Sequence, residues 1–396
     1  MIRSLEVKGL NNRDDGNFNF HFHEDLNIFT GANGSGKTTL LKLIWYLISG
    51  HLDRILAQIP FRSISIQTDL FALSMVRAKS NQVTLDSSFG KKEGVYEFIV
   101  IDAETGRIAR KDVDWVNALE KRIARATKQS LFFPTFRRIE GGFSRVTTDT
   151  DDSAIRFLVS TPEMLQASIS GFSNEVSING HKFIASISTE DLGELLTQKY
   201  ADIYEEISRR QSQVLDEIST EMQNNPDKDK VSEIPQDPSA VLNAIQKVNK
   251  EREQLSKPFS VLSELSRKIL RYDAIHVTGR IVRGETTDGI TLGAGNDGIT
   301  VGEAKEAISS DKLSSGEKQM LSFLCYNAFH NNMPIFIDEP ELSLHIDWQR
   351  LLLPTLLDQT TGNQFFIATH SPFIFSGYQH KEIPLKSDWA DKGRDI

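Results

Sequence analysis

The sequence contains very little cysteine. Cys325 is the only cysteine among 396 residues, and its neighbours Leu324 and Tyr326 are apolar or aromatic. A single thiol excludes a disulfide within the chain and a zinc site built on a Cys-x-x-Cys pair. Such sparse cysteine suits a reducing compartment, so we expect a cytoplasmic protein.

The sequence also lacks long hydrophobic runs and an excess of positive charge. No stretch of about 18 apolar residues occurs, so we expect no membrane span. The first residues alternate like a β-strand, so we expect no signal peptide. Lysine and arginine number 45 against 54 aspartates and glutamates, which gives a net charge of −9. This balance argues against a general nucleic-acid coat protein and leaves room for a local basic patch.

The clearest positive feature is a glycine-rich motif at residues 31–38. Its sequence, GANGSGKT, fits the P-loop pattern G-x-x-x-x-G-K-[ST]. The apolar residues 26–30 before it predict a buried strand, and the leucine-rich residues 38–49 after it predict an amphipathic helix. Strand, glycine loop and helix N-terminus in this order form the context that supports the motif.

This loop predicts a site for ATP and Mg²⁺. Glycine lets the backbone approach a ligand closely, and the amides and dipole at a helix start attract phosphates. Lys37 adds a positive charge near the terminal phosphates, and the Thr38 hydroxyl suits a Mg²⁺ ligand. The candidate binding residues all lie in the loop or at the helix start: Asn33, Gly34, Ser35, Gly36, Lys37, Thr38 and Thr39.

The remainder of the N-terminal part predicts a mixture of strands and one long helix. Strands that alternate with period two are expected at residues 2–9, 18–22, 63–67, 82–85 and 95–100. The helix is expected at residues 112–128. It carries basic residues that form either a solvated face or a contact for nucleic acid or an acidic partner. These residues are Lys121, Arg122, Arg125 and Lys128.

An apolar strand at residues 131–133 is followed by Arg137 and Arg138, which either form a structural ion pair or face the nucleotide or a partner.

The middle of the chain predicts a helical insertion. Apolar residues recur at helical spacing in 190–222, and shorter helical runs follow at 241–248 and 261–269. Packing of these helices against one another explains most of the apolar residues at helical spacing. The exposed tip of the helical insertion is the best candidate for a partner contact.

The C-terminal part carries three further motifs. Residues 313–317, LSSGE, open a predicted helix and form either an anion site or a simple serine N-cap with a nearby glutamate. Residues 334–340, PIFIDEP, predict a buried strand ending in Asp338 and Glu339. One carboxylate can hold Mg²⁺ while the next accepts a proton from the attacking water. Residues 364–372 predict another buried strand, and its end at His370 favours a functional histidine.

With these motifs in this order, the sequence resembles soluble ATP-binding-cassette (ABC) ATPases, similar to the heads of SMC and RecF proteins. It looks closest to the ATPase parts of the overcoming-lysogenization-defect (OLD) nucleases and of antiphage systems such as Septu, its retron-linked form, and PARIS. The matching segments are the P-loop, 313–317 as signature, 335–340 as Walker B, 341–345 as D-loop and 368–372 as switch.

The resemblance implies an α/β fold: an ABC-ATPase head with a P-loop core sheet, an antiparallel β subdomain and an inserted α-helical subdomain. Residues 1–145 would form the ATPase lobe with Walker A, and 146–272 the mainly helical insertion. Residues 273–396, beginning with short glycine-rich strands at 275–301, would form the lobe with the signature, Walker B, D-loop and switch histidine.

The resemblance also implies roles for single residues. Lys37 and the loop amides would hold the phosphates, and Thr38 and Asp338 would hold Mg²⁺. Glu339 would be the general base, and His370 would sense the γ-phosphate. The signature residues would cap ATP bound to a second copy, so we expect at least a head-to-tail homodimer; they are Ser314, Ser315, Gly316 and Glu317. For the Q-loop glutamine, Gln67 and Gln82 are the candidates.

This resemblance is compatible with three functions. The first is an ATPase that regulates an antiphage system, with a separate nuclease as partner. The last residues, 378–396, leave no room for the Toprim nuclease domain of OLD enzymes, so we expect no nuclease activity from this chain alone. The second is a repair or recombination ATPase of the RecF or SMC type, acting on nucleic acid directly. A transporter ATPase is disfavoured, because DEPELSLH resembles the soluble branch and no membrane partner is expected.

Overall fold

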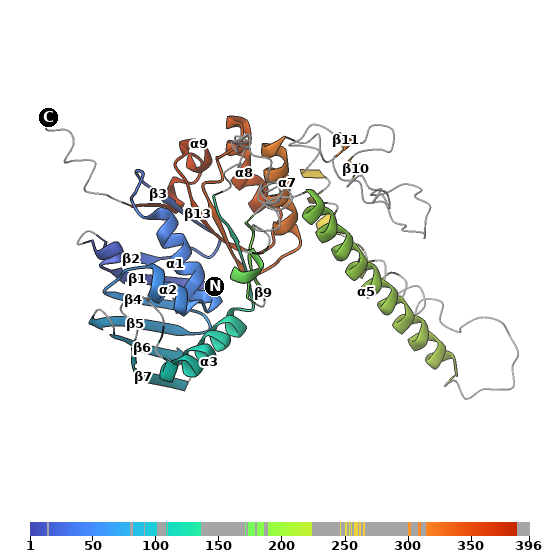
Figure 1. Cartoon of the computed structure of the whole chain (residues 1–396). Helices are drawn as coiled ribbons and strands as arrows, with labels where there is room; N and C mark the ends of the chain where they lie inside the picture. Colours follow the sequence, from blue (N-terminus) through green and yellow to red (C-terminus); the bar gives the residue numbers. More distant parts are fainter. Residues whose placement is uncertain are drawn as a thin grey trace, which may run out of the picture. The chain divides into compact units, whose positions relative to one another are not determined.

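The computed structural model describes the two ends of the chain and parts of its middle. The described residues are 1–13, 16–79, 82–90, 92–100, 108, 110–135, 171, 173–178, 180–185, 189–223, separate positions between 246 and 265, 300–301, 308–309 and 314–385. The chain splits into two compact units (Figure 1). Unit 1 comprises Met1–Ser186, His330–Pro354 and Thr360–Ile396, and unit 2 comprises Ile187–Phe329 and Thr355–Gln359.

Unit 1 contains a six-stranded sheet in which each pairing is parallel. In spatial order its strands are β14 (Glu382–Pro384), β3 (Leu26–Thr30), β13 (Gln364–Ala368), β12 (Pro334–Asp338), β8 (Gln129–Phe133) and β9 (Gly180–Phe183). β3, β12 and β13 are buried along their whole length. Their unbroken apolar runs suit a sheet that is covered on both faces. Parallel strands bring their carboxyl ends to one edge, and the sequence motifs lie at that edge.

A second six-stranded sheet in unit 1 is antiparallel throughout. In spatial order its strands are β2 (Phe18–His21), β1 (Ile2–Lys8), β4 (Ser63–Thr68), β5 (Ala72–Lys79), β6 (Gln82–Phe89) and β7 (Lys92–Val100). In β4, Ile64 and Ile66 are buried whereas Ser65 and Gln67 are exposed. This alternation is typical of a sheet with one face toward the core and one toward water.

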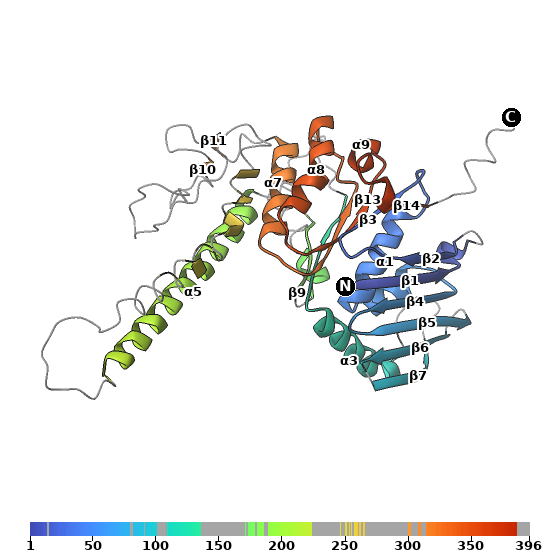
Figure 2. The same ribbon diagram turned by 180° about the vertical axis from the view of Figure 1, so that it is seen from behind.

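Three helices pack in unit 1 beside the sheets: α1 (Lys37–Ser49), α2 (Leu52–Gln58) and α3 (Arg110–Thr127). Helix α1 belongs to a single hydrophobic core together with residues of both sheets, for example Ile66 of β4 and Phe336 of β12. The two opposite views show α1 alongside the antiparallel sheet (Figures 1 and 2). Gly50, with φ +77°, ends α1 against α3, where an added Cβ would lie 2.4 Å from the Glu120 carbonyl oxygen.

Four further elements of the described chain follow or precede strands of unit 1. Helix α8 (Ile346–Asp358) follows β12 and has its last residues, from Thr355 on, in unit 2, and the single-turn helix α9 (Pro372–Phe375) follows β13. The 3-10 turn η4 (Gln379–Lys381) leads into β14, and a similar turn, η1 (Leu10–Asn12), follows β1. Helices α8 and α9 begin shortly beyond the carboxyl ends of β12 and β13, whereas Lys381 of η4 bonds Asp25, which directly precedes β3.

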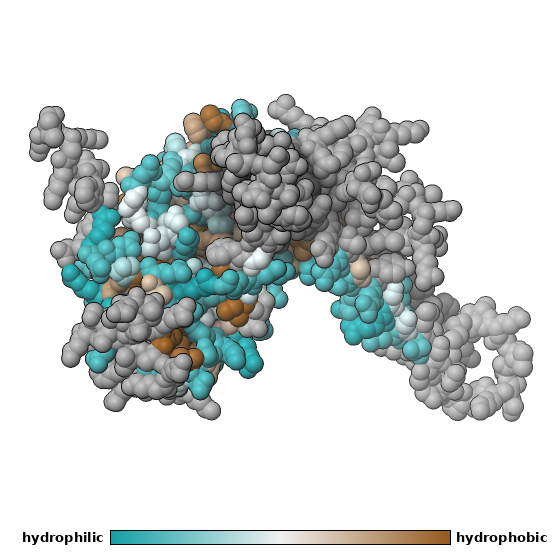
Figure 3. All heavy atoms as spheres, in the orientation of Figure 1, coloured by the Kyte–Doolittle hydropathy of each residue, from teal (hydrophilic) through white to brown (hydrophobic). Residues whose placement is uncertain are grey.

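In unit 2 the structure describes α5 (Thr189–Gln223), α7 (Ser315–Ala328), the end of α8 and a short antiparallel pair, β10 (Thr300–Val301) with β11 (Ile308–Ser309). The start of α5 is buried through Leu192 and Leu196, and α5 contacts α7. Further along α5, Arg210 bonds Glu251, one of the helical positions described between 246 and 265. The surface that α5 shows in Figure 3 is mostly hydrophilic.

The expected α/β fold class, with a P-loop core sheet and an antiparallel β section, is confirmed. Expected strands and helices are present where the structure describes them, but several elements were not predicted: β5, β9, β11, β14, α2, α8 and the short α9, η1 and η4. Lys128 does not belong to α3: the helix ends at Thr127, and Lys128 has φ +66°. The strands expected within 275–299 lie outside the described residues, and the three-part domain division stays a prediction. Among the described helices, no helix is both long and apolar enough to cross a membrane.

Candidate nucleotide-binding site

The P-loop joins the buried strand β3 to the first turn of α1. Gly34 and Gly36 have φ values of +77° and +94°, and a Cβ on either would meet nothing within 4 Å. The left-handed backbone rather than crowding therefore requires glycine at these positions. Gly36 is the N-cap of a 13-residue helix, so the loop amides and the positive end of the helix dipole face the same place.

The Lys37 side chain folds back over this loop. Its Nζ donates hydrogen bonds to the carbonyl oxygens of Gly31 at 2.9 Å and Ala32 at 3.0 Å. Burial lowers the pKa of Lys37, and the carboxylates of Glu339, Asp338 and Glu341 partly oppose that effect. The hydrogen bonds hold the Lys37 ammonium group at the loop, with three acidic side chains nearby. In this position the ammonium group can bind the negatively charged phosphates of a nucleotide.

Asp338 ends β12 beside the P-loop and is almost fully buried. Its Oδ1 accepts a hydrogen bond from the Thr38 hydroxyl at 2.9 Å, and its Oδ2 accepts one from the Thr135 hydroxyl at 2.7 Å. The structure thus joins Thr38 and Asp338, the two residues expected to hold Mg²⁺. A hydroxyl and a carboxylate are the hard oxygen ligands that Mg²⁺ prefers, so these residues fit the ion.

Sequence reasoning missed Thr135. It follows β8, the strand next to β12, and its hydroxyl fixes the second oxygen of Asp338. The available signal was a polar residue just beyond the apolar strand 131–133, two residues after its end. Arg137 and Arg138, the candidates that the sequence offers after this strand, lie outside the described residues.

Glu339 and His370 end neighbouring parallel strands. Glu339 has φ +49°, and its backbone N–H donates to the Ala368 carbonyl of β13 at 2.8 Å. His370 Nε2 lies 3.9 Å from Glu339 Oε1, and both side chains are partly exposed. Both side chains can therefore contact a molecule bound at the carboxyl edge of the sheet, while β12 and β13 fix the position of their backbone.

The P-loop, Glu339 and His370 surround an open pocket of about 830 Å³ in unit 1, and Asp338 lies buried behind its lining. The lining includes most of the residues predicted to bind nucleotide or catalyse hydrolysis: Asn33, Gly34, Gly36, Lys37, Thr38, Thr39, Glu339 and His370. Ser35 is not in the lining, because it is buried with its hydroxyl 3.5 Å from Lys37 Nζ. The pocket is also lined by Asn11 of η1 and by Glu341 and Leu342, which sequence reasoning did not select for this site.

The signature residues belong to unit 2 and are not among the lining residues. Ser314 caps α7: its hydroxyl accepts from Glu317 N–H at 3.3 Å, and the Glu317 carboxylate accepts from Ser314 N–H at 2.7 Å. This reciprocal arrangement is a capping box, one of the two alternatives for this turn. Leu313 lies outside the described residues. Ser314, Ser315, Gly316 and Glu317 keep their nucleotide role as a prediction.

The remaining candidates lie away from the pocket lining. Gln67 is an exposed residue of β4 and Gln82 belongs to β6, and neither lines the pocket. Lys121, Arg122 and Arg125 are exposed on α3, and the Arg122 guanidinium lies 4.0 Å from the centre of the Phe89 ring. Arg122 therefore has a packing role in the fold.

Two kinds of known protein resemble parts of this chain. Over 63 residues it is 40% identical to "Endonuclease GajA" of Bacillus cereus (strain VD045), a match that covers 14% of this chain and 11% of that protein. A solved Smc head domain with an extended coiled coil, bound to the C-terminal domain of ScpA and derived from Pyrococcus furiosus, aligns at 14% identity. That alignment covers 95% of this chain and 91% of the other, with a TM-score of 0.37.

An SmcHead bound to the C-winged helix domain of ScpA aligns at 13% identity, with the same coverage and a TM-score of 0.39. At such low TM-scores, neither structure supports an inference about this chain.

A family model described as "AAA domain, putative AbiEii toxin, Type IV TA system" matches residues 26–376. That range contains the P-loop, Asp338, Glu339 and His370 and spans most of the chain. The chain therefore belongs to this family of AAA-type ATPase domains.

Proposed function

We propose that the chain binds and hydrolyses ATP with Mg²⁺ and uses this reaction to control a separate nuclease in antiphage defence. The observation that carries the ATPase part is the bond between Thr38 and Asp338 at the P-loop, with Glu339 and His370 on the same pocket. P-loop, metal ligands and a base at one sheet edge are the parts that phosphoryl transfer to water needs.

Each residue then has a defined task. The loop amides and Lys37 hold the β- and γ-phosphates, and Thr38 and Asp338 hold Mg²⁺, which neutralises phosphate charge when bound. Glu339 accepts a proton from the water whose oxygen forms the new bond to the γ-phosphorus, while the bond to the ADP oxygen breaks. His370 donates a hydrogen bond to a γ-phosphate oxygen and so distinguishes ATP from ADP.

We propose that the working unit is a homodimer. The described residues that line the pocket belong to unit 1, while the resemblance assigns Ser314, Ser315, Gly316 and Glu317 to a nucleotide on the partner copy. Two copies arranged head to tail would complete two sites. ATP would then favour the closed dimer and hydrolysis would release it, which gives a partner protein two states to recognise.

The nuclease partner rests on two likenesses. The short match is to a protein named an endonuclease. The sequence resemblance to Septu, its retron-linked form and PARIS implies that the nuclease acts in antiphage defence. Direct action on DNA is the second candidate, and the exposed Lys121 and Arg125 on α3 are its support. DNA that stimulates hydrolysis severalfold, with an effect that Lys121→Ala plus Arg125→Ala removes, would favour this second candidate.

The test measures nucleotide binding, hydrolysis and mass in solution for three forms of the full chain. Wild type should hydrolyse ATP with Mg²⁺. Lys37→Ala should lose ATP binding by at least about 100-fold, because the buried ammonium is the main cation at the loop. Glu339→Gln should bind ATP as wild type does, lose hydrolysis by about 100-fold or more, and accumulate as dimer.

Unchanged ATP affinity in Lys37→Ala would refute the P-loop assignment. Turnover at the wild-type rate in Glu339→Gln would remove that residue as the base. For the partner, affinity purification of Glu339→Gln from its native host should recover a nuclease with the ATP-loaded form. Recovery of DNA without a nuclease would favour the second candidate.

A further inference from the structure

Two turns carry the residues at the γ-phosphate end of the pocket. The first, called the D-loop turn, comprises residues 339–345 after β12, and the second, the switch turn, comprises residues 369–371 after β13. The strands behind them pair in parallel, and Glu339 N–H bonds the Ala368 carbonyl. Beyond the strand ends the position of His370 depends on contacts between the turns themselves.

Gln349 of α8 contacts both turns with one side chain. Its Oε1 accepts a hydrogen bond from the Ser371 hydroxyl at 2.5 Å. Its Nε2 donates to the Leu344 carbonyl oxygen at 2.9 Å and, more weakly, to the Glu341 carbonyl oxygen at 3.4 Å. The amide group therefore uses its acceptor on the switch turn and its donors on the D-loop turn. Gln349 itself is not among the residues that line the pocket.

Glu341 ties the same two turns together on the pocket side. Its Oε2 accepts from the Thr369 hydroxyl at 2.8 Å, and its Oε1 accepts from the His370 backbone N–H at 2.6 Å. Ser371 N–H in turn donates to the Thr369 hydroxyl at 3.0 Å. The backbone on both sides of His370 is thus hydrogen-bonded to groups that belong to, or are held by, the D-loop turn and α8.

We infer that Gln349 is a positioning residue, which holds the switch turn against the D-loop turn and so keeps His370 in register with Glu339. The inference rests on the proposed ATPase function and deepens it, because it assigns a residue outside the pocket to the hydrolytic step. The D-loop turn also exposes Ser343 and His345 to solvent. Because Gln349 bonds both turns, a movement of His370 in the switch turn would also shift the D-loop turn and its exposed residues.

The main test replaces Gln349 by methionine, which keeps the length of the side chain and removes both hydrogen-bonding groups. Because the pocket lining is untouched, the Kd for ATP should stay within about twofold of wild type. A displaced His370 should lower kcat roughly tenfold, since small misplacements of reacting groups are costly. A merely structural role would not separate kcat from nucleotide affinity in this way.

Arg350→Met is the matched control. Arg350 is the next residue on α8, is exposed, and stacks on the Phe373 ring of α9 at 5.1 Å, so it also links these helices. Within the described part of the chain it forms no hydrogen bond with the switch turn, and its replacement should leave kcat within about twofold of wild type. An equal loss of kcat in Arg350→Met would overturn the inference, because any loosening of α8 against α9 would then suffice.

A second variant and a readout without nucleotide keep the inference testable if Gln349→Met folds poorly. Ser371→Ala removes the same bond from the other side, and kcat of the double variant should be no lower than that of the worse single variant. Amide hydrogen exchange of His370 and Ser371 should be about tenfold faster in Gln349→Met. Wild-type kcat and wild-type exchange in that variant would overturn the inference. A wild-type protein that does not hydrolyse ATP would instead overturn the proposed function, while the exchange measurement would still decide whether Gln349 holds the switch turn.

Discussion

The two sheets of unit 1 divide the work of this molecule differently. In the parallel sheet, β3, β12 and β13 are buried along their whole length, and Asp338, Glu339 and His370 stand at or just beyond its carboxyl edge. The antiparallel sheet alternates buried and exposed residues and, among the described residues, reaches the pocket through Asn11 beyond the end of β1. The chemistry therefore belongs to one sheet, and the other is expected to supply mainly stability.

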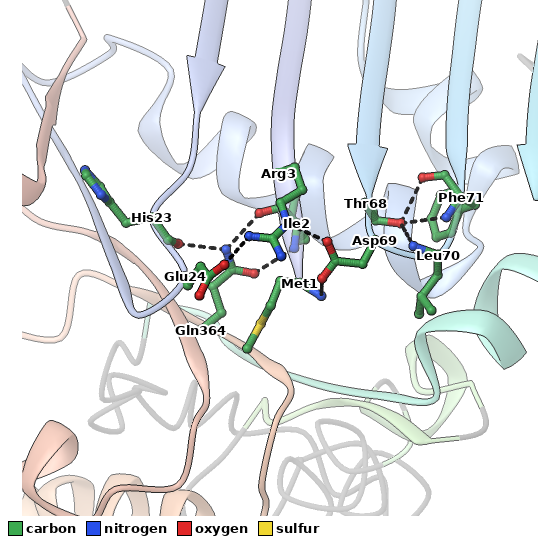
Figure 4. A network of polar contacts seen from close by, with 10 residues as sticks. All are labelled: Met1, Ile2, Arg3, His23, Glu24, Thr68, Asp69, Leu70, Phe71 and Gln364. Carbon is green, nitrogen blue, oxygen red and sulfur yellow. Dashed lines mark hydrogen bonds and ion pairs between the residues drawn. The ribbon is translucent and has the colours of Figure 1, made fainter. Parts of the chain in front are cut away.

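The two sheets are joined by a buried glutamine at the opposite end of the parallel sheet from the site. Gln364 begins β13, and its Oε1 accepts from Ile2 N–H of β1 at 2.8 Å. Its Nε2 donates to the carbonyl oxygens of Ile2 at 2.9 Å and His23 at 2.8 Å. Figure 4 shows these bonds beside an exposed network in which Arg3 lies between Glu24 and Asp69.

The largest effect on stability is expected at this junction. Gln364→Leu keeps a buried side chain of similar size but leaves three backbone groups without their partner, which should cost about 3 kcal/mol in the free energy of unfolding. Because the site lies at the far end of β13, kcat measured well below the unfolding temperature should change less than twofold. Urea unfolding and an ATPase assay on the same preparation check both parts.

Gln67→Leu is the control for Gln364→Leu. Gln67 is exposed on β4, so its replacement should change stability by no more than about 0.5 kcal/mol. The variant also tests the earlier Q-loop candidate, and hydrolysis should be unaffected. A loss of activity in Gln364→Leu as large as its loss of stability would contradict the division of work between the sheets.

A smaller effect, confined to activity, is expected for Thr135 at the functional edge. Thr135→Val keeps the shape of the side chain and removes the hydroxyl that bonds Asp338 Oδ2. Groups that orient a metal ligand typically contribute about tenfold to metal affinity or activity. We therefore expect ATP hydrolysis to need about tenfold more Mg²⁺ for half-maximal rate.

Thr135→Ser should restore most of the wild-type Mg²⁺ dependence, because it returns the hydroxyl. The unfolding free energy of Thr135→Val should stay within about 1 kcal/mol of wild type. If valine and serine variants both required wild-type Mg²⁺ concentrations, Thr135 would have no role in holding Asp338 for the ion.

The difference between the parallel and the antiparallel sheet also explains which elements and site residues could be predicted from the sequence. Strands buried on both faces are unbroken apolar runs, and a polar group at the end of such a run, such as Asp338 or His370, stands out. Motif spacing then identified most of the pocket lining, from Asn33 to Thr39 together with Glu339. β5 was missed because its sequence, ALSMVRAK, mixes polar and apolar residues without flanking glycine or proline.

Other site residues were beyond local sequence patterns, because their roles arise from contacts across long sequence distances. Thr135 meets Asp338 from 203 positions away. Asn11 enters the pocket through a left-handed turn, φ +57°, that the alternating strand pattern did not predict. Glu341 lies within the expected D-loop, but its bonds to Thr369 and His370 depend on the pairing of β12 with β13. Such residues become visible only when the sheet order is known.

The smallest effect is expected at Glu120, where helices rather than sheets set the stability. Burial raises the pKa of Glu120 on α3 to about 7, although Asp53 N–H at the start of α2 donates to its carboxylate at 3.1 Å and opposes the rise. A carboxyl whose pKa is higher in the folded than in the unfolded chain favours folding when protonated. Its contribution is therefore complete below pH 4.5 and is lost as the pH rises through 7.

Glu120→Gln keeps the shape and cannot ionise, so its stability should vary less than that of wild type between pH 4.5 and 8. Relative to wild type, the variant should gain about 1 kcal/mol over this interval, less than the full shift implies because the side chain remains in contact with water. Chemical unfolding at several pH values measures the difference. A wild-type protein whose stability relative to Glu120→Gln rose with pH would show that the Asp53 N–H outweighs burial, because that bond favours the ionised carboxylate.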